Sequence, residues 1–597
     1  EQQTTTVDTV TGATLASNAI MRAATQAARA AGLDTNALKA NAYHAQPGAD
    51  ETWNTEVLVI GGGGAGLSAA ISAAQNGAKV TLIEKAAVLG GNSFHAGGAF
   101  NAVDPEGQAS VIMAKATKDT LDSYLTVNKD TPELHLDLFP EWIPVLEALQ
   151  EEIKAFDAVN AGKTPGVDLP GFDSINLAMW HMYIGGLRQM NDGTWTASDV
   201  NMARSLASNG LDAYKWLGTL GVGGISYGTG LTRLNTVLGA MWPRTHGYAA
   251  GNGLIQPLKA AAEKAGVTIV TETEGTELLV NAGGKVVGAK AEKADGTKIT
   301  INTSKGVVLA TGGYCANPAM VKEYDKYWGE NLSATTLSTN AGTNEGDGIK
   351  MAMAIGADTR DLGVSQMMPS SSPVKGTMTD GLWASAESQL WIGADGKRFV
   401  DEYAERDVLA IASMAQKDGI FYIIYAGGAD AEGVCHGVNG ANDFRLKGAL
   451  SGGHVWYGST LAELAEATKK PAGGATSSFT EEQLRAAIEN YNKIVKDQYD
   501  PDFHKGNITG YIDLAAIEAD PNLGICITPR KASLHHTMGG VVINPNTEVI
   551  SESGNVIPGL WAAGEVTGGI HAGNRLGGNA VADIFTHGRI AGANAAK

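Results

Sequence analysis

Cysteine, positive charge and long apolar runs are all scarce in this chain, and each shortage excludes a class of protein. The cysteines Cys315, Cys435 and Cys526 are too few and too scattered for a disulfide framework, a zinc site or an iron–sulfur cluster. No Cys-x-x-Cys-His motif is present, so no c-type haem is attached to this stretch. Lysine and arginine total 44 against 63 acidic residues, and a net charge of −19 excludes nucleic acid as a main partner. No apolar run of about 18 residues occurs, so we expect no membrane span.

Glycine, by contrast, is present in excess. The chain has 77 glycines among 597 residues, whereas the usual share is about 7%. With only 18 prolines and no short repeat, this excess indicates neither collagen nor a simple linker. It predicts many positions where the backbone approaches another group closely. A hydrophobic content of 44% is enough for a sizeable core.

The first strand–helix–strand unit carries a dinucleotide-binding motif. We predict a buried strand over Glu56–Ile60, a helix over Ala65–Asn76 and a second strand over Lys79–Glu84. Between the first strand and the helix, Gly61 allows a tight turn, Gly63 lets the backbone reach a pyrophosphate, and Gly66 lets helix pack on strand. Glu84 ends the second strand and can accept a hydrogen bond from a ribose hydroxyl.

Further glycine clusters follow at wide intervals, and together they suit a long, extended cofactor. They occur around Gly90-Gly91, Gly97-Gly98, Gly312-Gly313 and Gly346, and twice more near the end of the chain. The candidate cofactor contacts are Gly61, Gly63, Gly66, Glu84, Lys85, Asn92, Ser93, Gly97, Gly98, Ala310, Thr311, Gly312, Asp347, Glu565, Arg575, Gly578 and Asn579.

Four motifs give the chain a resemblance to a known family. HHTMGG (535–540), GEVTGG (564–569), NRLGGNA (574–580) and ATGG (310–313) together resemble the fumarate reductase/succinate dehydrogenase flavoproteins. Within that family the chain is most similar to the soluble branch, with flavocytochrome-type fumarate reductases and urocanate reductase. The resemblance implies non-covalent FAD and an α/β fold, in which a two-dinucleotide-binding-type FAD domain carries an inserted α+β capping domain. It divides the chain into the FAD domain (55–365 and 516–597) and the capping, substrate-binding domain (366–515).

The N-terminus carries a second resemblance. Asp8-Thr-Val-Thr-Gly-Ala-Thr14 is similar to the flavin-transferase acceptor motif, which implies FMN bonded covalently through a phosphoester to Thr14. Alternatively, Thr14 caps the alanine-rich helix expected after it. On the first interpretation, residues 1–32 are the end of an FMN-binding domain and 33–54 a linker. Electrons would then arrive through FMN from an external cytochrome or quinol-linked donor, in anaerobic respiration outside the cytoplasm, after export by a signal peptide that is not in this fragment.

The family resemblance also implies the catalytic residues. Reducing an activated C=C bond requires a hydride source, a grip on the activating group and a proton donor. His535 and Arg575 match the residues that hold a substrate carboxylate, and Arg406 matches the arginine that donates the proton. Alternatively, Arg575 binds flavin phosphate and His535 is a core histidine. His536 and His571 are expected to be supporting residues, and Arg398 a structural one.

The distal half of the substrate site departs from the fumarate-reducing pattern. Met368 stands where fumarate reductases have the histidine that binds a second carboxylate, and residues 380–388 lack their Thr-Glu and Arg. That Glu and Arg refill the proton donor, so Glu387 and Asp380 are only candidates for the role. Met368 and Trp383 are expected to form an apolar wall.

We therefore predict an enzyme, an FAD-dependent oxidoreductase that reduces the C=C bond of a small unsaturated carboxylate. Its expected substrate is a monocarboxylate with an aryl or apolar tail, serving as terminal electron acceptor. The alternatives are a urocanate or fumarate reductase, a flavin ketosteroid dehydrogenase or reductase, and a non-catalytic electron-transfer flavoprotein.

Overall fold

The computed structural model of the protein describes residues 47–597, except 233, 379–380, 441 and 506–507, together with the isolated residues 24 and 31. The expectations for Thr14, for the N-terminal helix, for most of the linker and for Asp380 therefore fall outside the described residues.

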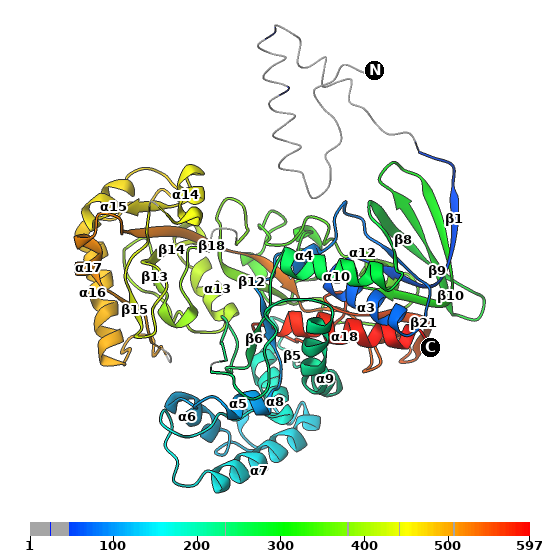
Figure 1. Ribbon diagram of the computed structural model, residues 1–597, viewed down its shortest axis with the longest axis horizontal. Helices are drawn as coiled ribbons and strands as arrows, with labels where there is room; N and C mark the ends of the chain where they lie inside the picture. Colours follow the sequence, from blue (N-terminus) through cyan, green and yellow to red (C-terminus); the bar gives the residue numbers. More distant parts are fainter. Residues whose placement is uncertain are drawn as a thin grey trace.

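A large sheet forms the first lobe, on the right of Figure 1. Its strand order is β20-β21-β10-β1-β2-β7, with β8 and β9 continuing from β10, and the central pairs are parallel. Because both of its faces are covered, the apolar end of β1 is buried throughout, as expected for a parallel strand. The strands are β1 (Glu51–Ile60), β2 (Val80–Ile83), β7 (Thr268–Val270), β8 (Thr273–Val280), β9 (Val286–Lys293), β10 (Lys298–Leu309), β20 (Glu548–Ile550) and β21 (Val556–Ala562).

The first strand is longer than the sequence predicted. β1 begins at Glu51, so residues 51–54, which we assigned to the linker, belong to the sheet. Their polar alternation hid the strand, because one face of this extension is exposed and only the other is covered. They pair in parallel with Ile299–Asn302 of β10 before an irregularity at Thr55–Val57 restores the buried register.

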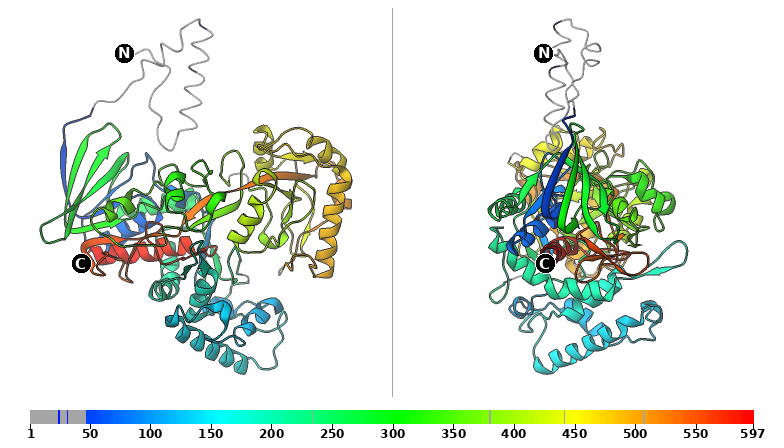
Figure 2. Two further views of the ribbon diagram at one scale, coloured as in Figure 1. Left: turned by 180° about the vertical axis from the view of Figure 1, so that it is seen from behind. Right: turned by 90° about the vertical axis from the view of Figure 1, so that its right-hand side faces the viewer.

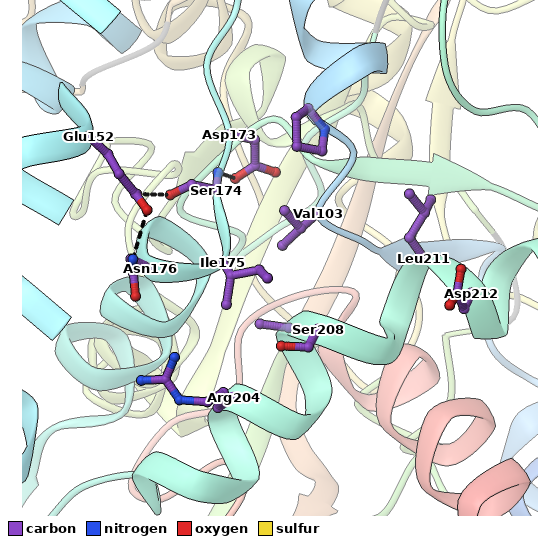
Figure 3. A pocket seen from close by; sticks show the side chains of 12 residues that line it. Val103, Glu152, Asp173, Ser174, Ile175, Asn176, Arg204, Ser208, Leu211 and Asp212 are labelled. Carbon is purple, nitrogen blue, oxygen red and sulfur yellow. Dashed lines mark hydrogen bonds between the residues drawn. The ribbon is translucent and has the colours of Figure 1, made fainter. Parts of the chain in front are cut away.

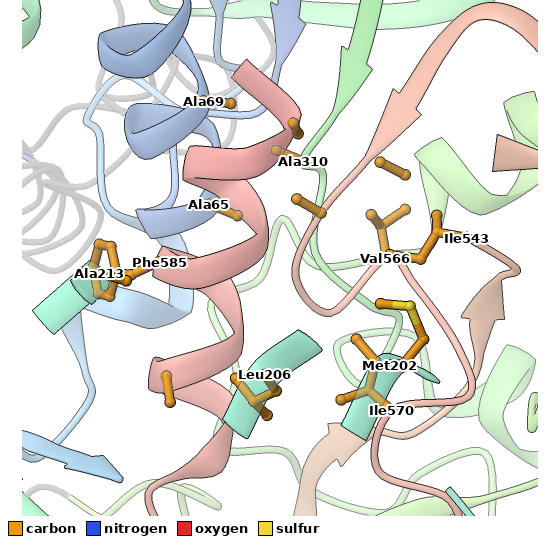
Figure 4. Packing of buried hydrophobic residues seen from close by; sticks show 14 of the residues in the cluster. Ala65, Ala69, Met202, Leu206, Ala213, Ala310, Ile543, Val566, Ile570 and Phe585 are labelled. Atoms are coloured by element: carbon orange, nitrogen blue, oxygen red, sulfur yellow. The ribbon is translucent and has the colours of Figure 1, made fainter. Parts of the chain in front are cut away.

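Two helices pack closely beside this sheet. They are α3 (Gly64–Gln75) and α18 (Asn579–Ala595), and Figure 4 shows Ala65 and Ala69 of α3 facing α18. A Cβ atom on Gly592 would lie 2.1 Å from the Ala69 carbonyl oxygen, so only glycine allows this approach.

A mostly helical region covers the rest of the first lobe and extends below it in Figure 1. Its helices include α7 (Ile143–Val159), α8 (Ile175–Gly186) and α9 (Val200–Thr219). The other helices are α4 (Gly91–Phe94), α5 (Pro105–Ala109), α6 (Lys115–Ser123), α10 (Asn252–Lys264), α11 (Pro318–Tyr324) and α12 (Asp347–Met353). Small strand pairs link these parts: β3 (Ala99–Asn101) with β6 (Thr245–Gly247), β4 (Arg188–Gln189) with β5 (Trp195–Thr196), and β11 (Thr359–Arg360) with β19 (Gly540–Val541).

A second lobe is built on a separate antiparallel sheet of order β12-β18-β14-β13, with β16 paired to β18. It has its own apolar clusters, and it stands beside the first lobe in Figure 1 and in the left view of Figure 2. Its strands are β12 (Ser365–Ser371), β13 (Leu390–Ile392), β14 (Ile420–Tyr425), β16 (Trp456–Gly458) and β18 (Ile525–Thr537), with a small pair β15 (Val434–Cys435) and β17 (Tyr511–Ile512). Its helices are α13 (Arg406–Met414), α14 (Phe444–Ser451), α15 (Leu461–Ala467), α16 (Glu481–Asp497) and α17 (Leu514–Ala519).

The second lobe extends beyond residue 515, where we placed its end. Ile517, Ile525 and Ile527 lie in its apolar core, although we assigned them to the returning FAD domain. The reason is β18, a single 13-residue strand that starts in the second lobe and ends beside the first. Composition cannot reveal such a boundary, because the strand is continuous and buried along most of its length.

Candidate functional site

The glycine-rich loop after β1 has the geometry of a phosphate cradle. Gly61 has a φ of 107°, and a Cβ on Gly66 would lie 1.8 Å from the Gly61 carbonyl oxygen, so both positions require glycine. At Gly63, by contrast, a Cβ would meet nothing closer than 3.8 Å. The first two glycines shape the turn, and the space at Gly63 leaves room for a ligand at the N-terminus of α3.

Glu84 directly follows β2, and its side chain is held in place by backbone N–H groups. The Glu84 carboxylate accepts hydrogen bonds of 2.7 Å from the backbone N–H groups of Gly62 and Ala86. Burial raises its pKa. Beside it, Lys85 forms ion pairs with Asp347 at 2.5 Å and with Glu345 at 2.9 Å.

A polar cluster farther along the cradle joins segments distant in the chain. Asn92 donates to Asn340 at 2.6 Å and to Glu565 at 3.4 Å, and Asn344 donates to the same two acceptors. Asn344 Oδ1 and the Thr311 hydroxyl are buried, and neither has a hydrogen-bonding partner among the described residues. Unpaired buried polar atoms in a glycine cradle are suited to the polar groups of a bound FAD.

The other predicted cofactor residues line the same region. Ser93 accepts from the backbone N–H of Gly64 at 3.0 Å, and Asn579 Oδ1 accepts from Asn101 at 2.9 Å. Gly98, Gly312 and Gly578 each have a positive φ, and a Cβ there would meet the Tyr248 backbone, the Asn344 side chain and the Asn101 side chain respectively. Ala310 directly follows β10, and its N–H donates to the Ile60 carbonyl oxygen. Gly97 has open space around its Cα.

The two predicted catalytic arginines meet at one oxygen atom. Arg406, at the start of α13, donates to Gln366 Oε1 at 3.1 Å, and Arg575 donates to the same atom at 2.8 Å. All three side chains are buried. The Gln366 amide nitrogen donates to the Asn574 side chain and to the Arg575 carbonyl oxygen, which fixes the orientation of the acceptor.

This pairing brings two buried guanidinium groups close together. Burial and the neighbouring Arg575 lower the pKa of Arg406 well below its usual value. Burial lowers the pKa of Arg575 to about 10, although Glu565 opposes that shift. Arg575 Nε is buried without a partner among the described residues. Two desolvated guanidinium groups with a spare N–H donor are suited to a carboxylate.

His535 lies in the same electrostatic field. Its Nδ1 is 2.7 Å from the Thr339 hydroxyl. Burial, Arg575 and Arg406 together lower its pKa well below the usual histidine value, so the ring is neutral at neutral pH. A neutral imidazole held at Nδ1 still presents Nε2 to a ligand. His571, predicted as a support, lies edge-on to His536 with ring centroids 5.4 Å apart.

Met368 and Trp383, the two residues predicted to form an apolar wall, lie in different local surroundings. Met368 is buried on β12, two residues after Gln366, and pairs in register with Ser533. Trp383 packs in an apolar cluster with Leu238, whose carbonyl oxygen accepts from Arg406 at 3.1 Å. The guanidinium of Arg530 lies 5.3 Å from the centre of the Trp383 ring. Among the described residues, no hydrogen bond joins Glu387 to Arg406.

Sequence reasoning missed Gln366 and the role of Asn574. Asn574 lies inside a motif that we used, but Gln366 has no sequence signal beyond a polar residue in an apolar strand. The register of β12 against β18 brings it to the site, because Gln366 pairs with His536 and so lies next to His535 in the neighbouring strand.

A separate cavity of about 450 Å³ lies between α8 and α9 (Figure 3). Its wall includes Glu152, Asp173 and Arg204, and none of the predicted site residues. Within the described chain there is no group of three or more metal-binding side chains, and no helix long and apolar enough to cross a bilayer.

Comparisons with known proteins agree with this geometry. The FAD binding domain family matches residues 56–581. An NADH:acrylate oxidoreductase of Vibrio harveyi is 35% identical over 99% of this chain and 56% of its own length. A fumarate reductase (cytochrome) of Shewanella frigidimarina is 30% identical, covering 91% of this chain and 77% of that protein. A urocanate reductase of Eggerthella lenta is 29% identical over the whole chain and 84% of its own length.

Solved structures give the same result. A flavocytochrome c3 fumarate reductase in an open conformation has a TM-score of 0.57 at 25% identity, covering 92% of this chain and 79% of its own. The chain spans only about half the length of the Vibrio harveyi relative. The family match, the cradle and the paired arginines agree, and the chain belongs to the FAD-binding flavoproteins, in the soluble branch that contains the flavocytochrome-type fumarate reductases.

Proposed function

We propose that the protein is an FAD-dependent reductase of the C=C bond of a 2-enoate. The observation that carries the proposal is the convergence of Arg406 and Arg575 on one buried oxygen, with His535 in the same field. An electron-transfer flavoprotein has no use for such a carboxylate clamp. The relatives named for acrylate, fumarate and urocanate reduction support the same class of reaction.

Each of the three residues has its own role in the proposed reaction. The chemistry that FAD supplies when bound is hydride donation from N5. Arg575 and His535 hold the substrate carboxylate, and the positive field stabilises the negative charge that develops on it as the β-carbon receives hydride. Arg406 then gives a proton to the α-carbon, and the lowered pKa of its guanidinium makes that transfer easier than it is in water.

We further propose that the substrate is a monocarboxylate with an apolar or aryl tail. Met368 cannot donate a hydrogen bond, and burying a second, unpaired carboxylate beside it would cost several kcal/mol. A thioether does favour aromatic edges and faces, by roughly 0.3–1.5 kcal/mol per contact. The acrylate named for the most identical of these relatives has one carboxylate.

Replacing Met368 by His should shift preference toward a dicarboxylate, because an imidazole can donate a hydrogen bond to the second carboxylate. The measurement is kcat/KM with a reduced dye for acrylate, a cinnamate-type acid, urocanate and fumarate, in wild type and Met368→His. A matched control is Met353→His on the surface of the first lobe. Fumarate as the best wild-type substrate would contradict this substrate assignment.

We also propose that FMN, attached to Thr14, passes electrons to the site from an external donor in anaerobic respiration outside the cytoplasm. The motif around Thr14 supports attachment. The proposed donor is a cytochrome or quinol-linked protein, whereas the name of the Vibrio harveyi relative specifies NADH for that protein.

Protein made together with a flavin transferase should keep flavin after denaturation, and the Thr14→Ala variant should release all of it, because the phosphoester needs the hydroxyl. Flavin fluorescence of the denatured protein measures the difference. Thr9→Ala, which removes a hydroxyl at one of the two unspecified positions of the motif, is the control. Covalent flavin that persists in Thr14→Ala would place the bond elsewhere.

A further inference from the structure

One arginine outside the predicted site contacts both of the chain neighbours of Arg406. Arg188 begins strand β4 in the first lobe, whereas Glu405 and Asp407 flank Arg406 in the second. The guanidinium donates to both oxygens of Asp407, with Nε–Oδ2 and Nη2–Oδ1 distances of 2.5 and 3.1 Å, and it also pairs with Glu405. These contacts join the first lobe to the second immediately beside Arg406, the proposed proton donor.

The same side chain also packs on the loop that carries the carboxylate clamp. A Cβ atom on Gly573 would lie 2.4 Å from Cβ of Arg188, so only glycine allows this contact. Gly573 precedes Asn574 and Arg575 in the chain. Asn574 links Glu405 to Gln366, because its side chain donates to Glu405 at 3.5 Å and accepts from Gln366 at 2.9 Å.

The charges around Arg188 are arranged to keep it in place. Asp407 is 5% exposed and also accepts from the Tyr327 hydroxyl at 2.8 Å. Burial would raise the pKa of Asp407, but Arg188 and Tyr327 hold it below its usual value. Burial favours the neutral form of Arg188, but the two carboxylates raise its pKa above the ordinary value. Such a buried bidentate pair is costly to break, because removing one partner leaves a desolvated charge behind.

We propose that Arg188 is a positioning residue, which places Arg406 against Arg575 only when the two lobes are docked. It does so by gripping both neighbours of Arg406 while packing on the clamp loop. The inference rests on the proposed function, in which Arg406 donates the proton. It adds a residue outside those proposed to hold the substrate or FAD, and it explains how lobe docking and assembly of the site are coupled.

The test compares Arg188→Ala and Arg188→Lys with Arg485→Gln. Arg485 is the matched control because it also pairs with two carboxylates, Glu481 and Glu518, but within the second lobe and near its surface. We expect Arg188→Ala to lower kcat by about 10- to 100-fold, since small misplacements cost that much, and to change KM by less than about threefold. Arg188→Lys should keep only part of the activity, because an ammonium lacks the planar fork. Arg485→Gln should match wild type.

Two readouts separate positioning from a general loss of stability. Guanidinium ion, at concentrations well below those that unfold the protein, should restore turnover of Arg188→Ala, whereas sodium at the same ionic strength should not. Amide hydrogen exchange should increase in α13 and stay unchanged in β1. If Arg188→Ala does not fold, Arg188→Lys with the same exchange measurement decides the question.

The outcomes distinguish this proposal from the proposed function. Normal turnover in Arg188→Ala, with unchanged exchange in α13, overturns the positioning role while leaving Arg406 as the acid. A loss that guanidinium does not rescue, accompanied by faster exchange throughout the chain, also overturns it. Normal turnover in Arg406→Gln would instead remove Arg406 as the proton donor, which is the part of the proposed function on which the inference rests.

Discussion

Replacing Arg406 by alanine should lower turnover by about 10²- to 10⁴-fold while leaving FAD bound, because general acid catalysis contributes that much. The residue lies at the start of α13 in the second lobe, away from the cradle residues around β1 and α3. The measurements are kcat with a reduced dye and the flavin content of the purified variant.

Arg406→Lys tests whether the planar guanidinium is needed. We expect little recovery, because lysine cannot donate to Gln366 Oε1 and to the Leu238 carbonyl in the same fork geometry. Arg398→Lys is a matched control, since Arg398 pairs with Glu402 and Asp500 inside the second lobe and makes no contact with the clamp. Near-normal turnover in Arg406→Ala would move the acid elsewhere.

Replacing Arg575 by glutamine should raise KM far more than it lowers kcat. Removing one partner of a buried, hydrogen-bonded charge pair costs about 3–5 kcal/mol, which corresponds to roughly 10²- to 4 × 10³-fold in binding. It also leaves the buried Glu565 without its nearby positive charge. Binding of a non-reducible saturated carboxylate, followed by the flavin absorbance change, measures the clamp without turnover.

The wild-type clamp should also weaken at high pH. The pKa of Arg575 is about 10, and the cation exists below that value, so carboxylate affinity should be constant from about pH 6 to 9 and fall as the pH rises through 10. A neutral ligand of the same shape provides the control, because its affinity should not follow this titration. Pronounced weakening between pH 6 and 8 would assign the dependence to another group.

Local physical rules explain why much of the FAD cradle could be predicted. Gly61 and Gly66 have no room for a Cβ, and a turn that excludes every other residue leaves a recognisable spacing in the chain. The strand over Glu56–Ile60 is apolar because both faces of the sheet are covered. The polar start of the same strand, from Glu51, escaped prediction because its pairing partner lies about 250 residues away in β10.

The proposed substrate site also contains some residues that the sequence could predict and others that it could not. Arg406, His535 and Arg575 could be found in their motifs, and the structure brings them into one field. Neither Gln366 nor Arg188 could be found, since each acts through partners more than 30 residues away and neither belongs to a recognisable motif.

By itself the sequence determined the cofactor class and the acidic character, because these depend on local sterics and on residue chemistry, and its motifs supplied the proposed catalytic side chains. Only the tertiary structure decided where the second lobe ends, what orients Arg406 and Arg575, and which contacts join the two lobes beside Arg406. Those features depend on the register of β18 against β12 and on contacts between β4 and α13. Long-range contacts of this kind are selected by packing of the whole chain, and no short stretch of residues encodes them.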